Sequence, residues 1–316
     1  MDNNPEINPD FLYMGRALQL AGCGGGRVAP NPMVGAVIVA GGRIIGQGFH
    51  AMYGGPHAEV HAIASVKSKD MELLCKSTIY VTLEPCAHFG KTPPCASLII
   101  STGIPRVVIG STDPNPLVAG KGIAMLENAG IKVVSGVMKK ECDELNKRFM
   151  TFHLLKRPWI QLKWAESADG FMADTDNEGN PVPVKFSNPL SAVWMHRERA
   201  RGEAIMVGSN TIRIDNPRLD VRKWGGKSPL KIECEHAMDL KSLIDGLYQK
   251  KITSLMVEGG PTLLNSFLKA GFYDEIRIET TSFPLGKGLR SPLLPDGLHL
   301  LSTEYVRENV IRNFRR

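Results

Sequence analysis

The sequence feature that most constrains this chain lies between His57 and Cys95, where three metal-binding side chains come from three separate places. His57 opens the stretch HAEVHAIASVK, Cys86 follows the strand-like TIYVTLEP, and Cys95 follows HFGKTPP. One imidazole and two thiols are the ligand set that zinc uses when it keeps a fourth position for water. We therefore expect a zinc site here, with the preceding residues forming its floor and the residues up to about 150 completing its sheet.

The pattern around this segment alternates strands with helices, which predicts a layered α/β sheet with crossover helices. Asp10 is the expected N-cap of the first helix, and Gly41 and Gly42 are the expected turn of a β-hairpin. We expect strands at 33–40, 43–50, 78–83, 106–110 and 131–136, and helices at 10–22, from His57 to 67, at 95–103 and at about 120–129.

The same alternation begins again after a Lys- and Glu-rich helix expected at about 138–155. Arg157 and Pro158 mark the boundary, so we expect two domains, 1–150 and 151–316. In the second we expect strands at 159–165, 203–208, 230–234, 254–260 and 274–281, and helices at 189–202 and 261–271.

Composition excludes several classes of protein. With 316 residues, 43% of them hydrophobic and 22% charged, the chain is long enough for two separate cores. It has neither an apolar run long enough to span a membrane nor a signal-peptide pattern, so we expect a cytoplasmic protein with no membrane partner. The net charge is +6, but Lys and Arg are scattered except at 312–316. This favours a small phosphorylated substrate and a solvated tail over nucleic acid. Six cysteines are too few for a disulfide framework.

Glu59, two residues after His57, is the expected proton carrier of the zinc site. Zinc lowers the pKa of its bound water to about 7, but another group must accept the proton and pass it on. Two residues along an ideal helix, Glu59 can face a substrate while His57 faces the metal. A metalloprotease pair of His57 and His61 would need Glu where Ala58 stands. A structural zinc finger would need a fourth ligand and a shorter spacing than the eight residues between these cysteines.

The pattern HAE, then PC, then a later Cys resembles the signature of cytidine and deoxycytidylate deaminases. The strings TLEPCAHFGKTPPC, APNPMVGAVIV and DPNPLVAGKG are similar to those of the bifunctional pyrimidine deaminase/reductase family of riboflavin biosynthesis, and the similarity covers nearly the whole chain. The resemblance implies a cytidine-deaminase-like α/β/α domain followed by a dihydrofolate-reductase-like α/β domain. It also implies deamination of 2,5-diamino-6-(ribosylamino)-4(3H)-pyrimidinone 5′-phosphate with one zinc ion per chain. The implied zinc ligands are His57, Cys86 and Cys95, the implied acid/base is Glu59, and the implied substrate contacts are Asn31, His50, His88 and Lys91.

The chemistry of these substrate contacts agrees with the resemblance. The Asn31 amide can read the edge of a pyrimidine, and imidazoles with a Lys can hold a phosphate. Asn31 equally suits an Asx turn between two prolines. Asp113 and Asn115 match the family's DPNP turn, where a structural and a binding role are both open.

The resemblance implies that the second domain reduces the ribosyl group to ribityl with NADPH. It rests on QLKWAESADG, SNTIRIDNPRLDVR and VEGGPTLLNSF. The turn at Gly259 and Gly260 leads into a helix N-terminus, which can cradle the phosphates of a cofactor. The implied substrate contacts are Lys163, Arg199, Leu219, Arg222 and Glu258, and the implied cofactor contacts are Ala165, Thr211, Asp215, Gly260, Pro261, Thr262, Leu263, Leu264, Asn265 and Ser266.

Two departures from the family pattern weaken the reductase half of this prediction. Pro183 and Lys185 stand where the family commonly has Ser and Trp. After Ile232, the family pattern has roughly fifty residues before the strand that leads to VEGG, whereas this chain has only ECEHAMDLKSLIDGLYQKKI, so a strand of the pattern has no counterpart. Either the reductase is shortened and weak, or a segment between about Ile232 and His236 is missing from the sequence. We favour the second alternative because the flanking motifs are intact, and an intact mass near 34.6 kDa would exclude it.

Two rival functions belong to other classes. A nucleic-acid base deaminase of the tRNA-editing type would share HAE and PC, but it would need a short Cys spacing and no reductase-like half. A non-catalytic metal-stabilised scaffold would have no use for Glu59. We therefore expect a zinc deaminase fused to an NADPH-dependent reductase, acting on a small phosphorylated pyrimidine, and we expect a homo-oligomer.

Overall fold

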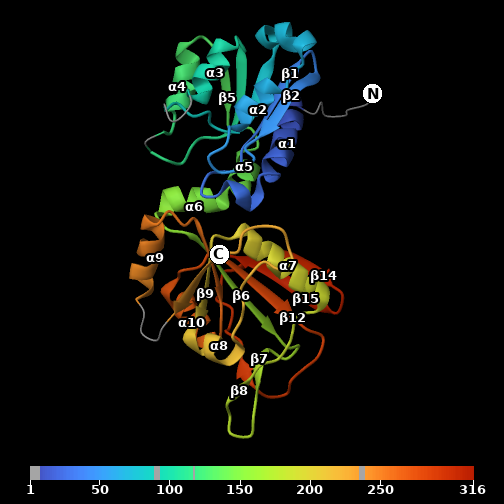
Figure 1. The fold of residues 1–316 in the computed structure, drawn as a ribbon, viewed down its shortest axis with the longest axis vertical. Helices are drawn as coiled ribbons and strands as arrows, with labels where there is room; N and C mark the ends of the chain where they lie inside the picture. The colour runs from blue at the N-terminus through green and yellow to red at the C-terminus, as the bar shows by residue number, and fades with distance from the viewer. Residues whose placement is uncertain (1–7, 89–92, 117, 235–238) are drawn as a thin grey trace. The chain divides into compact units, whose positions relative to one another are not determined.

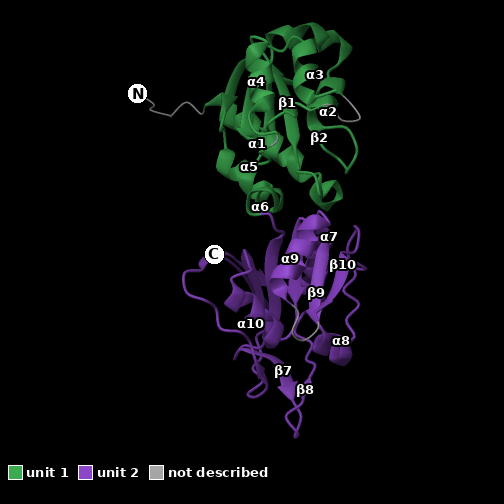
Figure 2. Ribbon diagram, turned by 90° about the vertical axis from the view of Figure 1, so that its left-hand side faces the viewer, with its two compact units in different colours: residues 1–155 green, residues 156–316 purple. Residues whose placement is uncertain are grey.

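The protein is described by a computed structural model, which covers residues 8–88, 93–116, 118–234 and 239–316. The chain forms two compact units, 1–155 and 156–316 (Figure 2). The predicted boundary between 150 and 151 falls inside α6 (Lys147–Leu155), a helix that belongs to the first unit. In the described residues, no helix has both the length and the apolar character needed to cross a membrane.

The first unit is built on a five-stranded sheet in the order β2-β1-β3-β4-β5. β1 is antiparallel to both β2 and β3, whereas β3, β4 and β5 run parallel. Gly41 and Gly42 join β1 to β2 with positive φ angles, which glycine adopts without strain, so the predicted hairpin is confirmed. The strands are β1 (Gly35–Ala40), β2 (Arg43–Phe49), β3 (Thr78–Leu83), β4 (Arg106–Ser111) and β5 (Lys132–Ser135).

Helices cover both faces of this sheet (Figure 1). Alanines of α2 and α3 and Leu126 of α4 pack with Ile38 and Ile79 in one core. Met14 and Ala17 of α1 pack with the opposite face. The predicted α/β/α layering is therefore confirmed. The helices are α1 (Pro9–Gly22), α2 (Ala58–Ala64), α3 (Cys95–Ser101), α4 (Lys121–Asn128) and α5 (Lys139–Leu145), with 3₁₀ turns η1 (Gly25–Val28) and η2 (Ser68–Lys76).

Two details of the predicted helices are wrong. Asn8, not Asp10, caps α1, since the Asn8 side chain accepts the Asp10 N–H at 3.0 Å. Asp10 instead points inward, where Arg106 and Tyr80 hold its carboxylate. The single helix predicted at 138–155 is two helices, α5 and α6, and Asn146 lies between them with its side chain bonded to the backbone of Met33.

The second unit contains a seven-stranded sheet in the order β10-β9-β11-β6-β12-β15-β14. The five strands from β10 to β12 are parallel, and β15 and β14 continue the sheet antiparallel. A smaller antiparallel sheet has the order β13-β7-β8. The strands are β6 (Trp159–Glu166), β7 (Phe171–Thr175), β8 (Pro181–Val182), β9 (Ala204–Gly208), β10 (Leu230–Cys234), β11 (Ser254–Glu258), β12 (Glu275–Thr280), β13 (Leu289–Arg290), β14 (His299–Val306) and β15 (Asn309–Arg315).

Within the described residues, four helices complete this unit. Leu264 and Phe267 of α10 and Ile244 of α9 pack in one core, and Met195 of α7 packs in a second core with Val207. The helices are α7 (Pro189–Arg201), α8 (Ser209–Asp215), α9 (Leu240–Gln249) and α10 (Pro261–Ala270). The prediction of a solvated tail at 312–316 is wrong for 312–315, because these residues belong to β15, which pairs with both β12 and β14.

Candidate functional site

The three predicted zinc ligands meet at one point in the first unit. His57 is the N-cap residue of α2, Cys95 is the first residue of α3, and Cys86 lies in the loop after β3. His57 Nδ1 is 3.3 Å from Cys95 Sγ and 3.6 Å from Cys86 Sγ. All three ligand atoms lie within 4.8 Å of one another. Atoms so spaced can surround one cation at the usual distances of about 2.0 Å to nitrogen and 2.3 Å to sulfur.

The protonation chemistry of the two thiols also suits a cation. Hydrogen bonds from Cys95 and from His57 lower the pKa of Cys86 to about 4. The hydrogen bond with Cys86, followed by burial, raises the pKa of Cys95. The hydrogen bond with Cys86 raises the pKa of His57. The protein by itself therefore favours one thiolate, and a bound cation would supply the charge that ionises the second.

Glu59 lies in the first turn of α2 and is 3% exposed. Burial, its largest influence, raises the pKa of its carboxyl group. Hydrogen bonding with Cys95 and the charge of His57 act in the other direction. The carboxyl group therefore lies beside the ligand cluster without belonging to the three groups that surround the metal position.

Asn31 and His50 lie next to the cluster. The His50 ring is perpendicular to the His57 ring, with the ring centroids 5.6 Å apart. Its Nδ1 is 3.0 Å from the Pro56 carbonyl oxygen, which can only accept, so Nδ1 donates. Nε2 is then the acceptor for the Asn31 amide Nδ2 at 3.3 Å. Burial lowers the pKa of His50, in agreement with this neutral ring. Both nitrogens of His50 are thus used within the protein, and its bond to Asn31 fixes the orientation of that amide.

The other predicted substrate contacts of the first unit are only partly described. His88 is exposed. Lys91 lies outside the described residues. Asp113 accepts the Asn115 N–H at 2.8 Å in an Asx turn, which corresponds to the structural one of its two possible roles.

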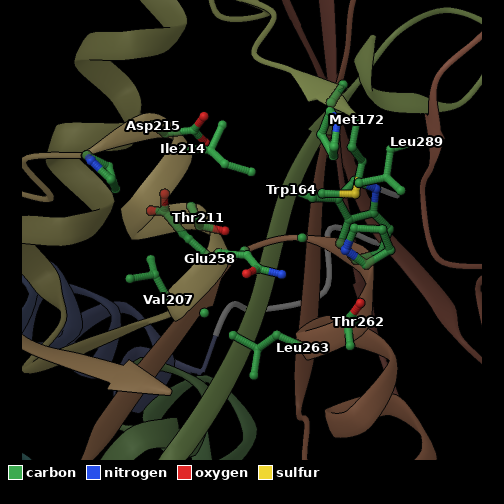
Figure 3. A pocket seen from close by; sticks show the side chains of 18 of the residues that line it. Trp164, Met172, Val207, Thr211, Ile214, Asp215, Glu258, Thr262, Leu263 and Leu289 are labelled. Carbon is green, nitrogen blue, oxygen red and sulfur yellow. The ribbon is translucent and has the colours of Figure 1, made fainter. Parts of the chain in front are cut away.

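The second unit contains a pocket of about 680 Å³ (Figure 3). It lies between the ends of the parallel strands, α8 and the N-terminus of α10. Figure 3 shows Thr211, Asp215, Glu258 and Thr262 around it. Of the predicted reductase residues, the pocket is lined by Lys163, Ala165, Thr211, Asp215, Leu219, Glu258, Gly260, Pro261, Thr262, Leu263 and Ser266.

Four predicted contacts are not among the lining residues. Leu264 is fully buried in the core, and the neighbouring Asn265 is half-buried. Arg222 is exposed and pairs with Asp220. Arg199 lies behind the pocket and binds the carboxylate of a residue that lines it, Glu258.

The pocket has two local features typical of a binding site, and the first of them suits an anionic group. α10 begins at Pro261 after Gly260, and its N-cap makes no side-chain hydrogen bond. Pro261 has no N–H, so the first N–H groups of the helix are those of Thr262 and Leu263, which line the pocket and can bind an anionic group. Leu219 lines the pocket with φ +52, a conformation that costs a non-glycine residue energy and is concentrated at binding sites.

Sequence reasoning missed several lining residues and one buried acid. Pro183, one of the two departures from the family pattern, lines the pocket, as do Trp164, Met172 and Phe186. Only the fold could identify these apolar residues, because their types are common in any core. Glu84 carries no signal in the sequence beyond its place in TLEPC, yet its buried carboxylate accepts four backbone N–H groups.

Comparison with known proteins gives consistent similarities for both units. The family described as the cytidine and deoxycytidylate deaminase zinc-binding region matches residues 8–111, and the RibD C-terminal domain matches 158–236 and 227–310. The RibD proteins of Aquifex aeolicus and Escherichia coli are 39% and 34% identical, covering 89% and 93% of this chain and the same shares of their own.

A crystal structure from Thermotoga maritima is described as a diaminohydroxyphosphoribosylaminopyrimidine deaminase/5-amino-6-(5-phosphoribosylamino)uracil reductase. It is 34% identical with a TM-score of 0.86, and the match covers 97% of this chain and 98% of that chain. Acinetobacter baumannii RibD is 28% identical with a TM-score of 0.84 and the same coverage. The first match of the C-terminal domain ends at 236 and the second begins at 227, so the two overlap in the region where part of the family pattern has no counterpart in this sequence.

Proposed function

Since this chain belongs to the RibD family of riboflavin biosynthesis proteins, in which a zinc-type deaminase is fused to a reductase, we propose the substrate of each unit and the residues that act on it. The first unit deaminates 2,5-diamino-6-(ribosylamino)-4(3H)-pyrimidinone 5′-phosphate. The second reduces the ribosyl group of the product to ribityl with NADPH. The observation that carries the proposal is the convergence of His57, Cys86 and Cys95 beside the buried Glu59.

In the deaminase, His57, Cys86 and Cys95 would hold one zinc ion. When bound, zinc makes water acidic enough to form the attacking hydroxide near neutral pH. The Glu59 carboxylate takes the water proton and delivers it to the nitrogen of the leaving amine. Glu59 suits this role because it lies beside the ligands and is shielded from bulk water.

Substrate recognition in the first unit would use one amide and a phosphate site. Asn31, oriented by His50, reads the polar edge of the pyrimidine. His50 acts through Asn31, because its own ring nitrogens are already engaged. His88 and Lys91 hold the 5′-phosphate as cationic donors.

In the reductase, the N-terminus of α10 would hold the phosphates of NADPH, with Thr211 and Asp215 on the other side of the pocket. When bound, the cofactor supplies the hydride. Lys163 and Glu258 line the same pocket and present a cation and a carboxylate to the sugar. Compartment and oligomeric state remain predictions from the sequence.

The test is to incubate the purified protein with the diaminopyrimidine phosphate, with and without NADPH, and to follow ammonia release and nicotinamide absorbance separately. We expect ammonia without NADPH, and NADPH oxidation only after deamination. Ammonia without any NADPH oxidation would indicate a degenerate reductase, the first alternative. Ammonia from a single-stranded nucleic acid but not from the pyrimidine would favour the nucleic-acid deaminase.

A further inference from the structure

Glu84 is a buried carboxylate that takes no part in the deaminase chemistry above. It follows directly after β3 and is 4% exposed. Its Oε1 accepts N–H groups of Gly122 at 2.9 Å and Ile123 at 3.4 Å. Its Oε2 accepts those of Gly120 at 3.0 Å and Asp113 at 3.2 Å. Buried carboxylates need compensating partners, and here all four donors belong to the main chain.

Three of these donors form the beginning of α4. The N-cap residue of α4 is Gly120, which has no side chain to accept the first N–H groups of the helix. Glu84 supplies this cap from a different segment, and its negative charge also suits the positive end of the helix. The fourth donor, Asp113, anchors the loop after β4 to the same carboxylate.

The first turn of α4 also packs tightly against the backbone of Pro85, the residue before Cys86. A Cβ atom on Gly122 would lie 2.0 Å from the Pro85 carbonyl oxygen, so glycine is required there. On its other side, Cys86 is bonded to the start of α3. The Cys86 oxygen accepts the Ala96 N–H at 3.2 Å, and Cys86 Sγ accepts the Cys95 N–H at 3.3 Å.

We propose that Glu84 is the positioning residue for the Cys86 sulfur. By tying α4 and the loop after β4 to the Pro85–Cys86 turn, it holds Cys86 Sγ toward His57 Nδ1 and Cys95. Glu84 acts through the backbone and touches neither substrate nor metal, so it is not a catalytic residue. The inference rests on the proposed role of Cys86 as a zinc ligand.

Replacing Glu84 by Gln tests this role. Gln has the same size, but its NH₂ group cannot accept, so about two of the four hydrogen bonds are lost. We expect the zinc affinity of E84Q, measured by competition with a chromogenic chelator, to fall about 10- to 100-fold, as for other partners that orient metal ligands. The cobalt-substituted protein should show weaker and shifted thiolate-to-metal absorption, because the geometry of Cys86 has changed.

Asp10→Asn is the matched control. Asp10 is also a buried carboxylate of the first unit, held by Arg106 and Tyr80, but it lies on α1, across the sheet from α2 and α3. Asp10→Asn should lower the melting temperature while zinc affinity and the cobalt spectrum stay as in the wild type. An E84Q protein that behaves in the same way would overturn the proposal, because Glu84 would then be only a stability element.

Glu84→Asp keeps the test informative if E84Q does not fold. Asp retains both oxygens but is one methylene shorter, so we expect a smaller loss of zinc affinity in the same direction. Wild-type zinc affinity in folded E84D would contradict the proposal. Zinc binding that survives Cys86→Ser unchanged would instead refute the ligand assignment, which separates failure of the proposed function from failure of this inference.

Discussion

The Arg199 guanidinium and the Glu258 carboxylate form a bidentate ion pair at the base of the reductase pocket. Arg199 Nε is 3.1 Å from Glu258 Oε1, Arg199 Nη2 is 2.8 Å from Glu258 Oε2, and both side chains are 13% exposed. The family resemblance implied that both contact substrate. In the structure they contact each other, and only Glu258 lines the pocket.

Arg199→Met should strongly destabilise the second unit, because it leaves a buried carboxylate without its main partner. We expect the free energy of unfolding, measured with urea, to fall by about 3 kcal/mol. Arg201 is 53% exposed and pairs with Glu198, which keeps a second partner in Arg197, so Arg201→Met is the control and should cost less than about 1 kcal/mol. Equal effects of the two changes would show that the buried pair contributes no more than an exposed one.

The Arg199–Glu258 pair should make the free energy of unfolding depend on pH. Burial alone would raise the pKa of Glu258, but the charges of Arg199 and Lys163 lower it below its usual value. A lowered pKa contributes stability that is complete above the unfolded value of about 4.3 and is lost as pH falls through the folded pKa. The difference in unfolding free energy between wild type and Glu258→Gln should therefore shrink as the pH is lowered below about 4. If the difference between the two unfolding free energies stayed constant with pH, the lowered pKa of Glu258 would be contradicted.

Glu59→Gln should retain zinc and lose deamination, because the ligands remain while proton transfer is removed. We expect ammonia release to fall at least about 100-fold, with unchanged metal content by elemental analysis. Glu72, an exposed residue of η2, provides the control, and Glu72→Gln should leave both unchanged. Appreciable turnover by the Glu59 variant would remove this residue from the acid/base role.

Cys86→Ser should lower zinc content and the melting temperature of the protein together. Metal binding and folding are linked when the site exists only in the folded chain. Cys23 is an exposed thiol outside the cluster, so Cys23→Ser should change neither quantity. Full zinc occupancy in the Cys86 variant would count against ligation by this residue.

The sequence predicted the central strands and the metal cluster well, and for different physical reasons. The apolar run at 78–83 has strand character throughout, and β3 has these same bounds. His57, Cys86 and Cys95 could be grouped because zinc accepts few residue types. The role of Glu84 depends on backbone N–H groups from distant segments. Nearly every residue type has such a group, so the sequence could not identify these partners.

Errors arose where a local signal had two interpretations. Asp10 has the chemistry of an N-cap, but Asn8 has it too, and the position of the half-buried Arg106 was needed to decide between them. Arginines at 312–316 suggested a solvated tail. Alternate residues of that strand, Asn309, Ile311 and Asn313, are buried, and this period-two pattern was obscured by the charged side chains between them.

Thr262→Glu should separate cofactor binding from stability in the second unit. Thr262 is exposed in the first turn of α10 and lines the pocket (Figure 3). A negative charge there suits the helix N-terminus, so the unfolding free energy should stay constant or rise slightly. The same charge would repel the phosphates of NADPH, and we expect its Kd, from fluorescence titration, to rise at least about tenfold, or about 1.4 kcal/mol. The neutral variant Thr262→Gln, of nearly the same size as the Glu variant, should bind NADPH much more tightly than Thr262→Glu, since only charge distinguishes them. Equal NADPH affinities of the two variants would show that the phosphates do not bind at the N-terminus of α10. Ammonia release should be the same in the wild type and both variants, because the deaminase belongs to the other unit.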